Sequence, residues 1–260
     1  MIHQNDESVL KKVSGEWIQK SISEIEDLDK LKHYALTSIP ELGPQWNNHI
    51  GTFLSRQTLS RVLYLDHLYR EMLGTPGVIL EFGVQWGTTL AQILNLRGIY
   101  EPYNHSRHIV GFDTFGGFAN VASEDEDFSN IGDYATSENY ESKLEDVLRI
   151  HEQNSPIPHI RKFDLVKGDV SETVPKWIEE NQHAIVAMAL FDLDLYQPTL
   201  DALKAILPRL VKGSILVFDE LNAKHFPGET LAVRKVLGLG SLKLNHFPHQ
   251  PNCSWVVWGE

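Results

Sequence analysis

Length, composition and charge exclude several classes of protein. A chain of 260 residues can form one large domain or a domain with an appendage, and its 42% hydrophobic and 22% charged residues argue against fibrous and disordered classes. The formal net charge of −12 argues against nucleic acid or an anionic membrane as a partner, because either would favour a basic face.

The sequence gives no sign of export or membrane insertion. Its first residues lack the apolar core that a signal peptide requires, and the longest apolar run, residues 184–191, is too short to cross a bilayer. A single cysteine, Cys253, excludes an intrachain disulfide and a thiolate-cluster metal site. We therefore expect a cytoplasmic protein in which Cys253 is structural.

The first 72 residues are predicted to form a helical N-terminal extension. Helices are expected at residues 9–25, 27–35 and 53–73, and the last has apolar side chains at helical spacing. The segment TSIPELGPQWNNHIG (residues 37–51) contains two prolines and two glycines, which predicts an irregular loop. This loop is either a plain connection or a lid or substrate wall that includes Trp46.

Residues 73–260 are predicted to form an α/β domain. Short β-like runs alternate with helical stretches, which is typical of a parallel sheet with crossover helices. Two last runs bracket HQPN and predict an antiparallel hairpin, so we expect seven strands in a mostly parallel sheet. The expected strands are 78–82, 108–113, 163–167, 185–192, 214–219, 242–248 and 253–259, and the expected helices are 88–97, 137–154, 174–181, 199–210 and 230–236.

Carboxylates follow five of the predicted strands. An open α/β sheet binds its ligands outside the carboxyl ends of its strands. Acids gathered there raise one another's pKa, so the pattern predicts a counter-charge, supplied by a cationic cofactor, a divalent metal or both. The acids are Glu81 in GVILEFG, Asp113 in HIVGFD, Asp169 in FDLVKGD, Asp192 and Asp194 in IVAMALFDLD, and Asp219 and Glu220 in SILVFDE.

The first three acids indicate a cofactor site. EFGVQWGTT follows a strand and opens a helix, where backbone amides favour an anionic group and Gly83 and Gly87 allow close approach. The spacing is neither the dinucleotide fingerprint nor a phosphate-binding loop, and a tight packing turn is the alternative. Asp113 can accept hydrogen bonds from both hydroxyls of a ribose. Asp169 can meet an adenine amino group or cap the following helix.

The last acids indicate a metal site. Carboxylates from the ends of two neighbouring strands suit a hard cation such as Mg²⁺. Asp192 and Asp194 share a face only if their strand continues through both. If the strand ends at Asp192, only one of the two acids need reach the metal. The alternative is that these acids cap the following helices.

The motifs together resemble the macrocin O-methyltransferase family of class I S-adenosylmethionine-dependent methyltransferases, which act on sugar hydroxyls in antibiotic pathways. The resemblance rests on EFGVQWGTT, GFDTFGGF, GDVSETVP, DLDLYQPTLDAL and LVKGSILVFDE, in that order between residues 75 and 236. The family pattern has D-G-D-L-Y and D-D-Y, whereas Leu193 replaces the glycine here and Glu220 replaces the second aspartate. The resemblance implies a Rossmann-like sheet with helices on both faces.

The resemblance also implies a role for each site residue. Glu81, Gly83, Gly87 and Thr88 would surround the amino acid end of S-adenosylmethionine, with Asp113 at the ribose and Asp169 near the adenine. Mg²⁺ would be bound by Asp192, Asp219 and Glu220. Asp192 would also be the catalytic base that takes the proton from the acceptor hydroxyl, and the acceptor would be a sugar hydroxyl of a natural product or of a nucleotide-linked deoxysugar.

Several alternatives stay open at this point. A histidine such as His225 or His246 competes with Asp192 as the base, and Asp194 has no secure role. Residues 119–140 form either a lid or a solvated acidic surface, and Trp46 and Trp86 are candidates for a sugar wall. A Mg²⁺-dependent enzyme acting on phenols or catechols, or a cofactor-binding protein without catalysis, would have similar motifs. The N-terminal extension predicts oligomer contacts or lid elements, and we expect a homo-oligomer.

Overall fold

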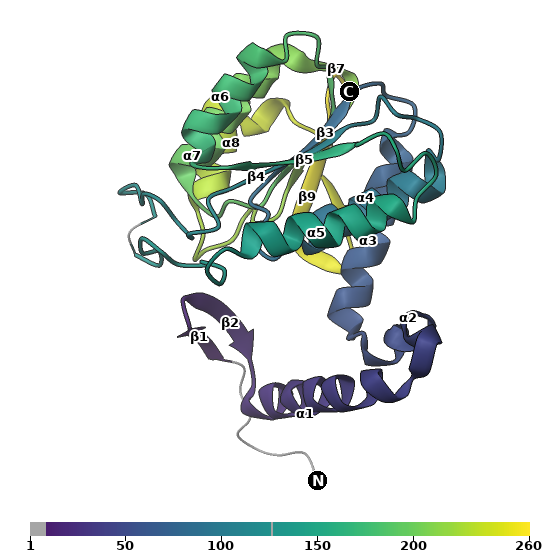
Figure 1. The fold of residues 1–260 in the computed structure, drawn as a ribbon. Coiled ribbons are helices and arrows are strands. Elements are labelled where there is room, and N and C mark those ends of the chain that lie inside the picture. Colours follow the sequence, from purple (N-terminus) through teal and green to yellow (C-terminus); the bar gives the residue numbers. More distant parts are fainter. Residues whose placement is uncertain (1–8, 126) are drawn as a thin grey trace. The chain divides into compact units, whose positions relative to one another are not determined.

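A computed structural model describes residues 9–125 and 127–260 of the chain (Figure 1). Its contacts divide the chain into two compact units, Met1–Arg61 and Val62–Glu260. The division falls inside helix α3 (Arg56–Met72), so the last turns of this helix belong to the second unit. Among the described residues, no helix combines the length and apolar character that a membrane crossing requires.

The first unit opens with a β-hairpin, so the predicted helix at residues 9–25 is wrong for most of its length. Strand β1 (Val9–Val13) pairs antiparallel with β2 (Glu16–Lys20). The connecting residues Ser14 and Gly15 have φ angles of 52° and 85°, as a type I′ turn requires. Because residues of both helical and strand propensity surround this turn, helical spacing alone gave the wrong prediction.

Helix α1 (Ile22–Ser38) follows the hairpin directly. A capping box explains why the helix begins here: the Glu24 amide donates to Ser21 Oγ, and the Ser21 amide donates to the Glu24 carboxylate. The predicted irregular loop is a series of short helical turns, and the helix expected at 53–73 is α3. These turns are η1 (Ile39–Glu41), η2 (Gly43–Gln45), α2 (Trp46–His49) and η3 (Ile50–Phe53).

The second unit contains the predicted seven-stranded, mostly parallel sheet. Its order is β5-β4-β3-β6-β7-β9-β8, and only the pairings made by β9 are antiparallel. The chain moves outward from β3 to β5 and then returns to add β6 and β7 on the other side of β3. The strands are β3 (Val78–Phe82), β4 (Ile109–Asp113), β5 (Phe163–Lys167), β6 (Val186–Phe191), β7 (Leu210–Phe218), β8 (Asn245–Phe247) and β9 (Gln250–Val257).

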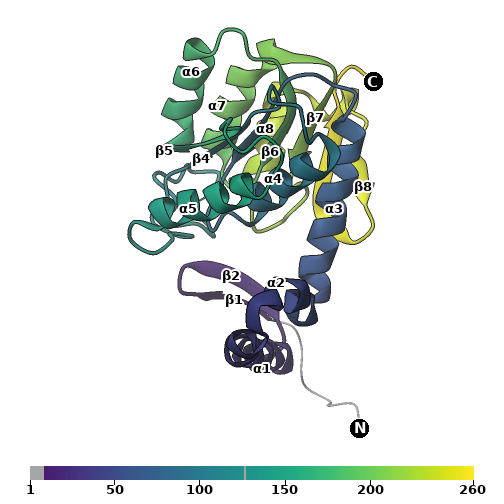
Figure 2. The same cartoon turned by 45° about the vertical axis from the view of Figure 1, so that its right-hand side comes forward.

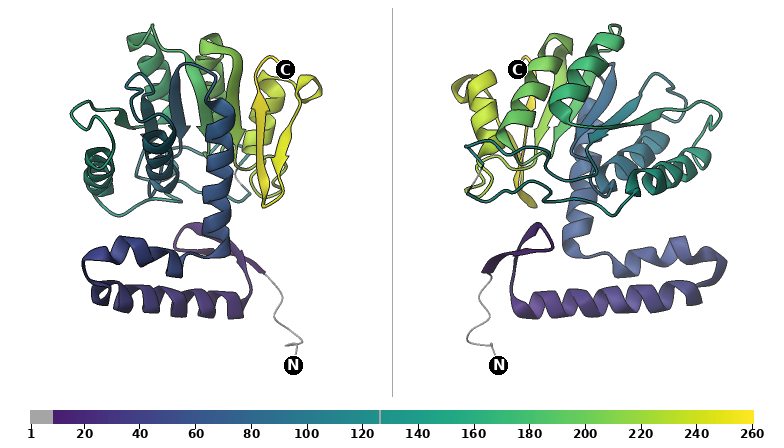
Figure 3. Two further views of the ribbon diagram at one scale, coloured as in Figure 1. Left: turned by 90° about the vertical axis from the view of Figure 1, so that its right-hand side faces the viewer. Right: turned by 60° about the vertical axis from the view of Figure 1, so that its left-hand side comes forward.

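Helices cover both faces of this sheet (Figure 1, Figure 3), which confirms the predicted architecture. Buried side chains of α3, α4 and α5 pack on one face, and those of α6, α7 and α8 pack on the other. Tyr64 of α3 contacts the rings of Phe247 and Trp255, which places α3 along the β8–β9 end of the sheet (Figure 2). The remaining helices are α4 (Thr88–Tyr100), α5 (Tyr140–Gln153), α6 (Val170–Glu180), α7 (Tyr196–Ile206), η4 (Leu207–Arg209), α8 (Gly228–Val236) and η5 (Leu239–Ser241).

The reversal of strand order between β3 and β6 decides where a ligand can bind. Connections that leave neighbouring strands in opposite directions open a crevice at their carboxyl ends. Gly83 follows β3 and Asp192 follows β6, and the Asp192 amide donates to the Phe82 carbonyl at 2.9 Å. The two segments that carry the predicted cofactor and metal residues therefore meet at this switch point.

Candidate active site

The sheet brings the predicted acids to one edge in a definite order. Asp169 follows β5, Asp113 ends β4, and Glu81 lies near the end of β3. Asp192 and Asp219 follow the next two strands, β6 and β7. The three acids predicted to bind the cofactor therefore occupy one half of the edge, and the predicted metal ligands occupy the other.

The turn from β3 to α4 depends on its two glycines. Gly83 has φ +88°, and a Cβ there would lie 2.8 Å from the Asp192 carbonyl carbon and closer still to its oxygen. Gly87 has φ +77° and caps α4, with Leu144 filling the space that a side chain would need. Thr88 is the exposed first residue of α4, whereas Glu81 is buried. Both glycines are thus required for the close packing of this turn, as the alternative interpretation of the motif proposed, and a role in binding the cofactor stays a prediction.

Asp113 holds the two turns beside it in place. Its Oδ2 accepts hydrogen bonds from the amides of Val84 (2.7 Å) and Gln85 (2.8 Å), and its Oδ1 accepts one from Phe115 (2.5 Å). Gln85 and Phe115 have φ angles of 46° and 55°, a backbone conformation that costs about 1–3 kcal/mol per residue and persists only where the surroundings hold it. A carboxylate has about four acceptor positions, so about one is left for a ribose hydroxyl.

Asp169 is the N-cap of α6. Its side chain accepts the Ser171 amide at 2.9 Å, as the alternative interpretation of this residue required. The Gly168 amide, next to it, donates to the Asp113 carbonyl at 2.9 Å, so Asp169 and Asp113 lie on adjoining segments. A role near adenine stays a prediction.

Acids crowd the other half of the edge. Partial burial raises the pKa of Asp194 well above its usual value, and Asp192, Glu220, Glu229 and Asp219 raise it further by adding negative charge around it. Strand β6 ends at Phe191, and Asp194 adopts a left-handed backbone with φ 61°, so Asp192 and Asp194 do not share a strand face. In residues 9–125 and 127–260, no group of three or more His, Cys, Asp or Glu side chains is arranged to hold a metal.

Glu229 is a site residue that the sequence analysis missed. It lies in the first turn of α8 and is fully buried. Its two carboxylate oxygens accept the Leu193 amide (3.2 Å) and the Glu220 amide (3.1 Å), which belong to the segments that follow β6 and β7. Burial and the nearby Asp192, Asp219 and Glu220 raise the pKa of Glu229 well above its usual value. The fragment FPGET predicts a helix start, and this was the only signal in the sequence.

The acidic loop after β4 also reaches this half of the edge. Asp125, which is 4% exposed, accepts the Tyr196 amide at the start of α7 at 2.8 Å. Burial raises the pKa of Asp125 to about 6. Further along the loop, Phe128 lies edge-on to His225, and Tyr134 lies edge-on to Phe226. The loop is therefore anchored on α7 and on the segment after β7, whereas its role as a lid stays a prediction.

The other candidates are placed as follows. His225 contacts Phe128, and His246 is exposed on β8, two strands away from β7, so a base role for His246 finds no support in its position. Cys253 is buried, as a structural cysteine would be, and its thiol donates to Asp219 Oδ1 at 3.1 Å. Trp86 packs edge-on against Tyr140 and is partly exposed, and Trp46 belongs to the first unit.

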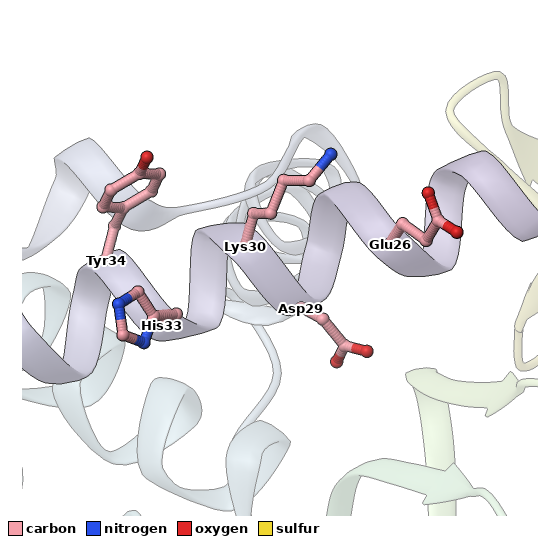
Figure 4. Close-up of a pocket in the computed structure, with 5 residues that line it drawn as sticks. All are labelled: Glu26, Asp29, Lys30, His33 and Tyr34. Atoms are coloured by element: carbon pink, nitrogen blue, oxygen red, sulfur yellow. The ribbon is translucent and has the colours of Figure 1, made fainter.

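A pocket of a different kind lies in the first unit. It is open and is lined by one face of α1 (Figure 4). All of its lining residues come from this single helix, and none of them is a predicted site residue, so the pocket does not compete with the sheet edge as a catalytic site. The lining residues are Glu26, Asp29, Lys30, His33 and Tyr34.

Comparison with known proteins identifies the family of this chain. The profile of the family described as macrocin O-methyltransferase (TylF) matches residues 43–235, which include every predicted site residue. The chain belongs to the macrocin O-methyltransferase family. It is therefore an S-adenosylmethionine-dependent O-methyltransferase, and the resemblance found in the sequence motifs is confirmed.

The likeness to solved structures extends over nearly the whole chain. The crystal structure of the calicheamicin methyltransferase CalS11 is 41% identical, covers 98% of this chain and all of its own, and has a TM-score of 0.90. The apo structure of CalS11, described as a TDP-rhamnose 3′-O-methyltransferase, is 40% identical over 94% of this chain and 97% of its own, with a TM-score of 0.82. The O-methyltransferase NovP shares the fold at 16% identity and a TM-score of 0.60, over 76% of this chain and 79% of its own.

A more distant relative has a name that describes a rhamnosyl-tetracenomycin 4′-O-methyltransferase. It is the 8-demethyl-8-(2,3-dimethoxy-α-L-rhamnosyl)-tetracenomycin-C 4′-O-methyltransferase of Streptomyces olivaceus, and it is 22% identical over 193 residues. The match covers 69% of this chain and 66% of the relative, just under two thirds of that enzyme's length.

Proposed function

We propose that this protein transfers the methyl group of S-adenosylmethionine to a hydroxyl of a nucleotide-linked deoxysugar. The observation that carries the proposal is the likeness to CalS11, which extends over nearly the full length of both chains. The tetracenomycin relative supports a sugar hydroxyl as the general acceptor, and a sugar already attached to a natural product is therefore the second candidate.

The cofactor half of the edge would hold S-adenosylmethionine through the β3–α4 turn. The turn at Gly83 and Gly87 leads into the α4 N-terminus at Thr88, whose backbone amides suit the carboxylate of the cofactor, and Glu81 suits its ammonium and sulfonium charges. Asp113 would accept one ribose hydroxyl with its remaining acceptor position, and Asp169 would meet the adenine. Loss of the sulfonium charge after methyl transfer would then favour release of the product cofactor.

The other half of the edge would position and deprotonate the acceptor. The acceptor oxygen attacks the methyl carbon in line, the carbon–sulfur bond breaks, and its electron pair stays on sulfur. Asp192 takes the hydroxyl proton, and it lies beside Gly83 at the boundary between the two halves. Much of the acceleration comes from holding the oxygen about 3 Å from the methyl carbon.

We include Mg²⁺ in this proposal as a cofactor held by Asp192, Asp219 and Glu220. The donor chemistry fits: these residues offer hard carboxylate oxygens, and their crowding raises the pKa of nearby Asp194, a cost that a divalent cation would relieve. When bound, the ion would lower the pKa of the acceptor hydroxyl. Among the described residues these acids are not arranged as a metal-binding group, so binding of the ion would require their side chains to move.

A matched pair of variants tests the assignment of the base. Asp192→Asn should reduce kcat by at least about 100-fold, because general-base catalysis contributes about that much, while affinity for S-adenosylhomocysteine stays within about twofold. Asp194→Asn is the control, since it removes a neighbouring acid with no assigned role. Equal losses of kcat in both variants, or a loss of cofactor binding in Asp192→Asn, would contradict the assignment.

We also propose that the protein forms a homo-oligomer through its first unit. None of the seventeen residues of α1 is buried, and Ile22, Tyr34 and Leu36 are each more than half exposed. Light scattering on the full chain and on an Ile22→Glu/Leu36→Glu double variant tests this. A monomeric wild-type protein would refute the proposal, as would a double variant that keeps the wild-type mass.

A further inference from the structure

The first turn of α8 connects the loops that surround the acceptor half of the edge. Glu229 accepts amides from both acid-bearing segments, and the next residue, Thr230, accepts the Asn222 amide at 2.9 Å. The residue before them is Gly228, where a Cβ would lie 2.5 Å from Asp125 Oδ1 and 2.6 Å from the Leu195 carbonyl carbon. Three consecutive residues thus contact the segments after β6 and β7 and the loop after β4.

Burial of the Glu229 carboxyl among other acids costs free energy, and this cost indicates a role beyond packing. A carboxyl that is 0% exposed and surrounded by Asp192, Asp219 and Glu220 gains no salt bridge with a cation in the described parts of the chain. A glutamine would fill nearly the same volume without the charge. What glutamine cannot do is accept two amides, one on each oxygen, because its nitrogen is a donor.

We infer that Glu229 is a positioning residue for methyl transfer: its two oxygens fix the spacing between the segment that carries Asp192 and the segment that carries Asp219 and Glu220. The inference rests on the proposed function, because it assigns Glu229 to the acceptor half and leaves the cofactor half unaffected. A displacement of the reacting groups by about 1 Å lowers the rate about 100-fold.

Two variants separate the effect of side-chain length from the effect of charge. Glu229→Gln keeps the length of the side chain but loses one of the two acceptors, and Glu229→Asp keeps the charge but is one methylene too short to reach both amides. The control is Glu152→Gln, which alters another buried acid far from the edge: Glu152 accepts the Lys162 amide at 3.1 Å, just before β5 begins, and pairs with Arg97 at 3.5 Å.

The first measurement does not depend on activity. Hydrogen exchange, resolved to the Leu193 and Glu220 amides, should become faster in both Glu229 variants than in the wild type and the Glu152→Gln control. Unchanged exchange at both amides would overturn the inference. This readout stands even if no acceptor sugar is found, so failure of the proposed function and failure of the inference are distinguishable.

The second measurement is the division between kcat and KM. Both Glu229 variants should lose about 100-fold in kcat, with KM for S-adenosylmethionine within about twofold of the wild type. Glu152→Gln should lower the melting temperature, because the buried side chains of Arg97 and Lys162 both form ion pairs with Glu152 and would lose their charged partner. It should keep wild-type kcat at a temperature where it is folded. A kcat loss in the Glu229 variants no larger than that of the control, or a parallel loss of cofactor affinity, would overturn the inference.

Discussion

Gly83 is the point where the two halves of the site touch, so Gly83→Ala is the most informative single change. The added Cβ would lie 2.8 Å from the Asp192 carbonyl carbon, whereas carbon atoms in favourable contact are about 3.5–4.0 Å apart. Because the added Cβ would lie closer still to the Asp192 carbonyl oxygen, relief requires the Asp192 backbone to move by at least about 1 Å. A displacement of this size at a catalytic base predicts a loss of about 100-fold in kcat.

The same substitution should also lower stability. An alanine with a left-handed backbone costs about 1–2 kcal/mol, and forcing an extra carbon into a packed site adds about 1–3 kcal/mol. We therefore expect a loss of about 2–5 kcal/mol in the free energy of unfolding. Gly238→Ala is the matched control, since Gly238 has φ +74° in the same compact unit but its nearest neighbour would be 3.9 Å from the added Cβ.

The assay is methyl transfer from labelled S-adenosylmethionine, with melting temperatures measured in parallel. Gly238→Ala should lose only the first, conformational part of the stability and should keep the wild-type kcat. The steric reasoning would be refuted if Gly83→Ala matched Gly238→Ala in both melting temperature and kcat.

Three further predictions concern the metal, the loop after β4 and the adenine end of the site. Chelation by EDTA should suppress turnover and added Mg²⁺ should restore it, and an enzyme indifferent to both would remove the metal from the proposal. The pKa of Asp125 is raised in the folded state to about 6, so the contribution of its proton to stability is fully present below about pH 4 and is lost as pH rises from about 4 through 6, by at most about 3 kcal/mol in total. The difference in melting temperature between wild type and Asp125→Asn should therefore change between pH 5 and pH 7.5, and a constant difference would contradict the burial argument. Asp169→Ser keeps a good helix cap but loses the carboxylate, so it should melt like the wild type and bind S-adenosylhomocysteine about tenfold more weakly, whereas unchanged affinity would leave Asp169 as a cap alone.

The sheet could be predicted from the sequence because each parallel strand is an apolar run that ends at an acid or a glycine. Apolar runs that close on an acid or a glycine identify both the strand and the edge at which it ends, and Asp113 and Asp192 were found in this way. The strand order could not be derived from those signals, but the order observed explains why Gly83 and Asp192 meet.

What the sequence did not reveal depends on contacts between distant segments. Glu229 acts through the Leu193 and Glu220 amides, and no spacing along the chain encodes that pairing. The β1–β2 hairpin was missed for a local reason, because the Ser14–Gly15 turn is short and its strands contain residues that also suit helices. Asp125 was visible only as one of several acids in a polar loop, until the structure placed it on the N-terminus of α7.

The proposed function requires a sugar hydroxyl as the methyl acceptor. The most direct measurement is mass spectrometry of a panel that contains TDP-linked deoxysugars, free glycosides and catechols, each incubated with S-adenosylmethionine and Mg²⁺. We predict the gain of one methyl group on the sugar of a nucleotide-linked acceptor, with stoichiometric formation of S-adenosylhomocysteine. Methylation of the catechols alone, with the sugars unchanged, would contradict the account.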